Sequence, residues 1–292
     1  MARYVFGCRQ CRKGHDAPVL DGGLIKLAAV ADFDFIYTST DAGENWTKRL
    51  DAGSRRWRSI ASSSDGTKLA AVADEAFIYT STDAGESWTE RTNAGIRRWS
   101  SIASSSDGMK LAAVVDFAFI HTSTDAGESW TERLDAGSRR WRSIASSSDG
   151  TKLAAVADFD FISTSTDAGE NWTERLTAGF QSWSSIASSS DGMKLAAVAD
   201  RDFIYTSTDA GKNWTKRTNA GIRRWRSIAS SSDGMNLAAV ADEDLIYTST
   251  DAGENWTERL DAGIQSWSSI ASSSDGMNLA AAVFGDSIWT YA

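Results

Sequence analysis

The segment Ser39-Thr-Asp-Ala-Gly-Glu-Asn-Trp46 recurs along the chain in near-identical form. Its first five residues return every 42 residues without insertion, beginning at Ser39, Ser81, Ser123, Ser165, Ser207 and Ser249. A second tryptophan keeps the same interval, at Trp57, Trp99, Trp141, Trp183, Trp225 and Trp267. A fixed period of this length is the sequence signature of a repeat architecture.

Each 42-residue unit contains four short segments that have the composition of β-strands. In the second unit we expect strands at residues 57–62, 69–73, 77–81 and 88–91, with turn residues such as Ser-Asp-Gly and Asp-Ala-Gly between them. The segment at 69–73 is apolar throughout, as expected of a strand covered on both faces. All four are too short for helices.

Four strands in a unit of this length match a blade of a β-propeller. The first two strands are rich in Ala and Ser, which suits the crowded axis, and the outer two carry aromatic residues that fill the wider gaps between blades. We therefore predict an all-β fold, a seven-bladed β-propeller of four-stranded 42-residue blades, in a single domain spanning residues 1–292. A solenoid of stacked β units is the alternative architecture, and it does not explain the size gradient.

The number of blades follows from the second strand. Its Leu-Ala-Ala sequence occurs seven times, from Leu27 to Leu279. A six-bladed ring is the alternative, but it leaves the last two strands without partners, and unpaired strand edges favour aggregation. With seven blades, the diverged segment 1–26 supplies closing strands. One period before Trp46 lies Tyr4, so we expect Arg3-Tyr-Val-Phe6 to be the fourth strand of the last blade.

The recurring octapeptide matches the Asp-box pattern, Ser/Thr-x-Asp-x-Gly-x-x-Trp, in all six copies. Over residues 27–292 the chain resembles the BNR/Asp-box repeats of sialidase-like and photosystem II assembly factor-like propellers. The resemblance implies that the box is a hairpin between the third and fourth strands of a blade. In such a hairpin, Ser39 and Asp41 bind nearby backbone amides, Gly43 adopts a positive φ, and Trp46 packs between blades.

Composition excludes several classes of function. The net charge is −9, whereas proteins that bind nucleic acid usually concentrate Lys and Arg, so we expect no nucleic-acid partner. No apolar run is long enough for a membrane span, and residues 1–20 lack the apolar core of a secretory signal. We expect a cytoplasmic location by default, because residues 1–20 show no secretory signal. An extracellular location is the alternative that the resemblance implies.

The sequence offers no set of catalytic residues. The only histidines are His15 and His121, so no Ser-His-Asp triad can form. Sialidases carry an Arg-Ile/Leu-Pro motif, but here the single proline, Pro18, follows Ala17. We therefore predict that the protein is not an enzyme and needs no cofactor. A degenerate sialidase-like glycoside hydrolase is an alternative.

The N-terminal segment holds the only cysteines. Cys8 and Cys11 have the C-x-x-C spacing that chelates zinc, and His15 is a third potential ligand. A fourth protein ligand is missing unless Asp16 or Asp21 serves. We predict no metal site, with Cys8, Cys11 and His15 as candidates if one exists.

Variation between units gathers on one face of the disc, in the turn between the second and third strands and in the link before each inner strand. Arg58 and its equivalents alternate between Arg and Ser. Arg and Trp together suit an anionic glycan or an acidic protein partner. The candidate ligand-binding residues are Arg56, Trp57, Arg58, Arg98, Trp99, Arg140, Trp141, Arg142, Arg224, Trp225 and Arg226.

These patterns predict a non-catalytic binding or scaffold propeller, with a multivalent carbohydrate-binding lectin as a further alternative. The opposing interpretation is that the arginines form a solvated rim and that Trp57 and its equivalents belong to the core.

Overall fold

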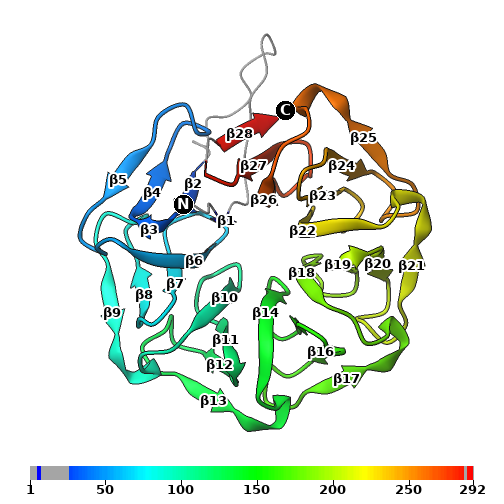
Figure 1. The fold of residues 1–292 in the computed structure, drawn as a ribbon. Helices are drawn as coiled ribbons and strands as arrows, with labels where there is room; N and C mark the ends of the chain where they lie inside the picture. The colour runs from blue at the N-terminus through cyan, green and yellow to red at the C-terminus, as the bar shows by residue number, and fades with distance from the viewer. Residues whose placement is uncertain (1–4, 8–25, 286–287, 292) are drawn as a thin grey trace.

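The computed structural model describes residues 5–7, 26–285 and 288–291, which form a ring of small antiparallel sheets around a central axis (Figure 1). We number the blades 1 to 7 by their inner strands. These strands are β1 (Val5–Gly7), β6 (Arg55–Ser62), β10 (Trp99–Ser104), β14 (Arg139–Ser146), β18 (Trp183–Ser188), β22 (Arg223–Ser230) and β26 (Trp267–Ser272).

The chain then runs outward through each blade as a meander. The second strands are β2 (Leu27–Val30), β7 (Leu69–Ala73), β11 (Leu111–Ala118), β15 (Leu153–Ala157), β19 (Leu195–Asp202), β23 (Leu237–Ala241) and β27 (Leu279–Val283). The third strands are β4 (Ile36–Ser39), β8 (Ile78–Ser81), β12 (Ile120–Ser123), β16 (Ile162–Ser165), β20 (Ile204–Ser207), β24 (Ile246–Ser249) and β28 (Ile288–Tyr291). The outer strands are β5 (Thr47–Arg49), β9 (Thr89–Arg91), β13 (Thr131–Arg133), β17 (Thr173–Arg175), β21 (Thr215–Arg217) and β25 (Thr257–Arg259).

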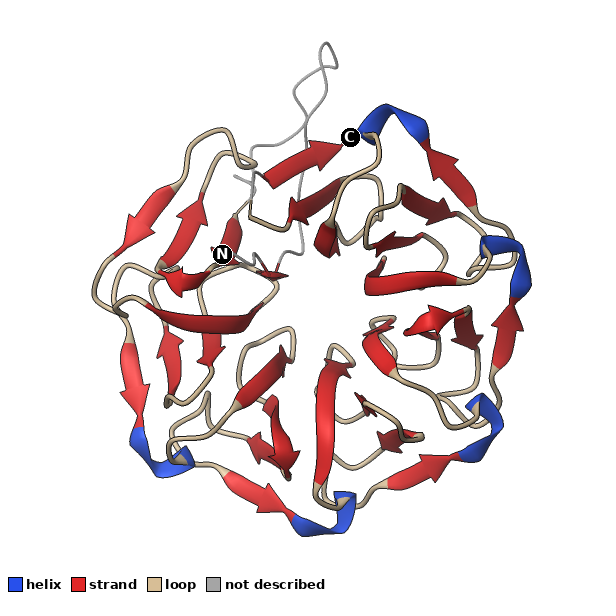
Figure 2. Ribbon diagram, viewed as in Figure 1, coloured by secondary structure: helices blue, strands red, loops and turns tan. Residues whose placement is uncertain are grey.

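Short elements connect neighbouring blades. Blades 2 to 6 each end in one turn of 3-10 helix on the perimeter, beginning with η1 (Thr92–Ala94) (Figure 2). On one face, β3 (Asp32–Asp34) and the ends of β11 and β19 pair with the inner strand of the next blade. The variable turn and the variable link are therefore hydrogen-bonded to each other across a blade boundary.

The inner strands close the ring. Each contacts the next in order, and β1 lies between β26 and β6. Within the described residues the ring comprises seven blades, some joined to the next by β3, β11 or β19, and this number is consistent with the sequence prediction of seven rather than six. A solenoid is also excluded, because its first and last units would not touch.

The expected role of the N-terminal strand is wrong in one respect. Val5–Gly7 pairs with β2 as the inner strand of blade 1, instead of forming the fourth strand of the last blade. Val5 pairs with Val30, 25 residues on, whereas the equivalent Ser59 pairs with Val72, 13 residues on. Counting back by a constant period failed because the connection after β1 is longer than in the other blades.

Tryptophans of the inner strands fill the space between blades. Trp57 is fully buried, and its ring packs edge to face on that of Tyr79, with the two ring centroids 5.3 Å apart. The same hydrophobic cluster contains Val30 and Ile36 from blade 1. Because each cluster combines side chains of two blades, no blade covers its own core, and burial depends on the neighbouring blade.

The Asp box is a hairpin between the third and outer strands, as the resemblance implies. Ser39 Oγ donates to Asp41 Oδ1 at 2.7 Å, and the Gly43 amide donates to Ser39 Oγ at 2.9 Å. The Asn45 amide donates to Asp41 Oδ1 at 2.9 Å and holds the pKa of that carboxyl at about 2. Gly43 has φ +86°, a conformation that a side chain would strain.

The inner tryptophans differ in one hydrogen bond, which makes a matched test of the core. Trp99 Nε1 donates to the Ala76 carbonyl at 3.0 Å, whereas Trp57 Nε1 has no partner. Both Trp→Phe changes create a similar cavity, but only Trp99→Phe also removes a hydrogen bond, and the Ala76 carbonyl then keeps only the Arg97 amide, at 3.1 Å, of its two described donors. We expect Trp99→Phe to lower the free energy of unfolding by about 1 kcal/mol more than Trp57→Phe, which is the typical net contribution of one hydrogen bond. Equal losses in urea unfolding would contradict this.

The Asp boxes predict a sharp response to acid. Backbone amides lower the pKa of Asp41, Asp83 and Asp251 to about 2. A carboxyl with a lowered pKa in the folded state stabilises the fold above its unfolded pKa of about 4, and this contribution is lost as the pH falls toward 2. The urea midpoint should therefore fall steeply between about pH 4 and pH 2. A constant midpoint over that range would show that these hydrogen bonds do not stabilise the fold.

Candidate functional site

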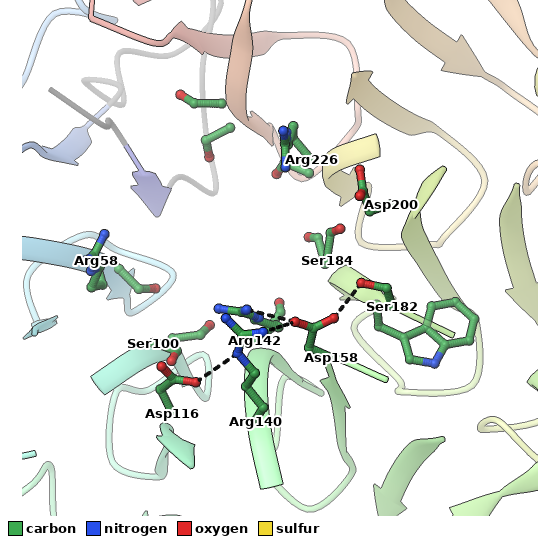
Figure 3. A pocket seen from close by; sticks show the side chains of 18 of the residues that line it. Arg58, Ser100, Asp116, Arg140, Arg142, Asp158, Ser182, Ser184, Asp200 and Arg226 are labelled. Carbon is green, nitrogen blue, oxygen red and sulfur yellow. Dashed lines mark hydrogen bonds and ion pairs between the residues drawn. The ribbon is translucent and has the colours of Figure 1, made fainter. Parts of the chain in front are cut away.

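A cavity of about 860 Å³ lies on the axis of the ring, lined by the inner strands and by the ends of the second strands (Figure 3). Small side chains leave this space open. Ser59 and its equivalents line the wall, and Ser59 Oγ accepts the Ile102 amide of the next blade at 3.3 Å. Four further blade pairs repeat this bond at 3.2–3.4 Å. The open edges of the inner strands are thereby satisfied without filling the axis.

Two kinds of blade alternate around the cavity. Blades 2, 4 and 6 place Arg58, Arg142 and Arg226 on its wall, and blades 3, 5 and 7 place a serine there: Ser100, Ser184 and Ser268. The arginine blades also have the longer inner strands, eight residues against six. The cavity is therefore chemically asymmetric although its backbone is repetitive.

Each arginine of this set shares a carboxylate with a second arginine of its own blade. Arg58 Nη2 and Arg56 Nη1 lie 3.1 and 3.0 Å from Asp74 Oδ2. In blade 4 the two distances to Asp158 Oδ2, from Arg142 and Arg140, are 2.9 and 2.6 Å.

Blade 6 has the same arrangement, and one of the shared carboxylates has a lowered pKa. In blade 6, Arg226 and Arg224 lie 2.7 and 3.2 Å from Asp242 Oδ2. Burial acts to raise the pKa of Asp158, but the Ser182 hydroxyl and the guanidinium of Arg142 outweigh it and hold that pKa below its usual value. In blades 2, 4 and 6, one carboxylate thus contacts two guanidinium groups of its own blade, and Asp74 also has Arg98 Nε of the next blade at 3.5 Å.

Carboxylates in the other blades are less well matched. Asp116 has Arg98 Nη2 at 3.5 Å and Arg140 Nε at 3.7 Å. Blade 5 has Ser182 in place of Arg98, and among the described residues Asp200 has only Arg224 as an ion-pair partner, with its Nε at 3.9 Å. The Asp200 side chain is 34% exposed, against 12% for Asp116. The aspartates follow the second strands at the repeat interval, a signal that the sequence contained and that our prediction missed. They are Asp32, Asp74, Asp116, Asp158, Asp200 and Asp242.

The structure separates the predicted ligand-binding residues into two groups. All seven arginines belong to the ion-pair network around the cavity, namely Arg56, Arg58, Arg98, Arg140, Arg142, Arg224 and Arg226. The four tryptophans, Trp57, Trp99, Trp141 and Trp225, are buried between blades. Their rings cannot stack on a sugar, so this part of the prediction is wrong, and the opposing interpretation holds for them.

Exposed aromatic side chains occupy the variable face instead. Phe159 lines the cavity and is 66% exposed, and Phe180, in the following link, is also exposed. The turn that carries Phe159 has a φ of +52° at this residue. The guanidinium of Arg140 lies 5.3 Å from the ring of Phe117 on the same face. Apolar and cationic groups thus lie side by side at the rim.

No further chemistry is evident in the part of the chain that the structure describes. His121 is buried, with its Nε2 3.3 Å from Glu132, and burial lowers its pKa. No group of three potential metal ligands occurs among the described residues, and no helix there is long and apolar enough to cross a membrane. Cys8, Cys11 and His15, the candidate metal ligands of the sequence analysis, lie outside the described residues.

The family comparison agrees with the hairpin geometry. A model of the BNR/Asp-box repeat matches residues 205–216, which run from β20 through the box into β21. The other five boxes have the same sequence pattern and the same position between strands. The chain is a β-propeller of BNR/Asp-box repeats. No curated protein matches it significantly.

Solved structures are similar to this propeller at low sequence identity. YCF48 bound to D1 peptide is 16% identical, with a TM-score of 0.68 over 88% of this chain and 86% of that one. YCF48 from Cyanidioschyzon merolae is 12% identical, with a TM-score of 0.72 over 99% and 94%. An ancestral GH74 enzyme is 16% identical, with a TM-score of 0.64 over 81% of this chain but 36% of that one. At such identities the likeness shows the fold alone.

Proposed function

We propose that this propeller is a non-catalytic binding protein whose axial cavity receives an acidic segment of a protein partner. The observation that carries the proposal is the position of Arg58, Arg142 and Arg226 on the cavity wall, each sharing a carboxylate with a second arginine. Guanidinium groups offer several N–H donors in a fixed plane, so one that contacts an internal carboxylate can still bind a second anion.

The charge around the cavity supports this choice. The network of seven arginines and six aspartates has an excess of one positive charge, whereas the whole chain has a net charge of −9. The cavity lining itself contains five arginines and five aspartates, so it lacks the negative excess of the chain as a whole. Exposed Phe159 and Phe180 at the rim add apolar contact area for a peptide.

The comparisons favour a protein partner over a sugar. One similar propeller is described with a peptide bound to it, and the indole rings expected to stack on sugars are buried here. A GH74 enzyme is also similar in fold, which keeps glycoside hydrolysis as the alternative to be tested.

Serine already occupies the position of the cavity arginines in blades 3, 5 and 7, so replacing the arginines by serine tests the site with a residue that the fold accepts. The triple variant Arg58→Ser, Arg142→Ser, Arg226→Ser gives three blades the residue that the other three already have, so the fold should survive. We expect a glutamate-rich peptide to bind the parent protein and to bind the triple variant at least about tenfold more weakly, measured by titration calorimetry.

A matched control removes the same charge from the perimeter, by Lys48→Ser, Lys212→Ser and Lys216→Ser. This control should keep most of the affinity, because exposed charges far from a site are screened by salt. Equal affinity for a lysine-rich peptide of the same length, or equal loss in both triple variants, would refute the proposal.

Hydrolysis of fluorogenic glycosides tests the alternative. A retaining or inverting glycosidase needs two carboxyl groups, one of which stays protonated near neutral pH. The cavity aspartate with a resolved shift, Asp158, has a lowered pKa and would be ionised there. We expect no turnover above the uncatalysed rate. Turnover abolished by Asp158→Asn would favour the enzyme.

A further inference from the structure

The outer edge of blade 7 differs from that of every other blade. In blades 1 to 6 an outer strand pairs with the third strand, as β25 does with β24. In blade 7, β28 pairs with β27, and no other strand of the described residues pairs with it (Figure 1). An unpaired strand edge presents a row of backbone donors and acceptors to which another chain can add.

One side-chain hydrogen bond is shared by blades 1 to 6. The arginine that ends the outer strand donates through Nε to a threonine of the third strand, at 2.7–2.8 Å in every case, from Arg49 to Thr38 through to Arg259 to Thr248. Thr290 occupies the same position on β28 as Thr248 on β24. Blade 7 therefore keeps the acceptor of this bond, and no described arginine bonds to it.

The hydrophobic cluster between blades 6 and 7 also differs. In the other six clusters, a tryptophan that precedes an outer strand packs against the cluster, as Trp256 does against the cluster that contains Val198 and Ile204 of the preceding blade. The cluster containing Trp267 and Ile246 includes no such tryptophan among the described residues. Trp289 on β28 is 43% exposed, whereas the equivalent Tyr247 is 1% exposed.

The chain itself contains no spare segment of the required kind. All 13 tryptophans lie in the described part of the chain, twelve of them in the blade positions above and the last at Trp289. Residues 1–26 contain neither tryptophan nor threonine. Residues 1–292 therefore contain no Trp-Thr-x-Arg segment beyond the six that already form the outer strands of blades 1 to 6.

We propose that the outer edge of β28 binds an extended Trp-Thr-x-Arg segment of a partner chain by strand addition. The pairing of β24 with β25 sets the register: Ile246 opposes Arg259, Tyr247 opposes Glu258 and Thr248 opposes Thr257. By this template, the partner's arginine lies opposite Ile288 and donates to Thr290. Its tryptophan enters the cluster between blades 6 and 7. Main-chain hydrogen bonds give the affinity, and these two side chains give the specificity.

A fluorescein-labelled peptide with the sequence of residues 254–260, Glu-Asn-Trp-Thr-Glu-Arg-Leu, tests this directly. We expect saturable binding to the whole 292-residue chain in fluorescence anisotropy. Replacing the peptide's tryptophan or its arginine by alanine should weaken binding about tenfold or more. A scrambled peptide should not bind.

Two matched protein variants locate the site. Thr290→Val removes the acceptor on the open edge and should weaken binding about fivefold to tenfold. Thr248→Val makes the same change in blade 6, where the chain's own Arg259 is the donor, and should leave the affinity unchanged. The proposal is overturned if the peptide shows no saturable binding up to about 1 mM. It is also overturned if the scrambled peptide binds equally or if Thr290→Val has no effect.

Discussion

A tryptophan on each inner strand can be buried only if the next blade covers it. Trp57 shares its cluster with Val30 and Ile36 of the preceding blade, and the same arrangement is repeated around the ring. A large indole removed from water on both faces contributes several kcal/mol, and a single sheet cannot supply both faces. The blades are therefore stable together, and closure of the ring is a requirement of the packing.

Much of this could be predicted from the sequence, since a constant interval fixes the strands, the turns and the hairpin of the Asp box. The prediction failed where the interval fails. The long connection between Gly7 and Leu27 shifts β1 out of phase, and a periodic count cannot detect it. Burial of Trp57 was ambiguous for another reason, because the sequence marks a strand residue without showing which face its neighbour covers. The partner of Arg58, Asp74, was recognisable only by its position after the second strand.

Symmetry also explains where function can lie. Asp41 and its five equivalents each stabilise a hairpin, so their presence does not indicate where a single binding site lies. Differences between blades do carry it. The alternation of Arg58 with Ser100 gives the axial cavity its charge pattern, and β28, whose outer edge pairs with no described strand, breaks the pattern at the perimeter. The repetitive scaffold holds both features in place, and at β28 the packing differs from that of the other blades.

Amide hydrogen exchange of the second strands tests the closed ring most directly. If every blade is covered by two neighbours, β2 and β27 at the join should be protected to a degree similar to that of β11 and β15 in the middle of the chain, because local opening is limited by packing on both sides. Protection that declines steadily from the middle blades toward both ends would indicate an open array and would contradict the account.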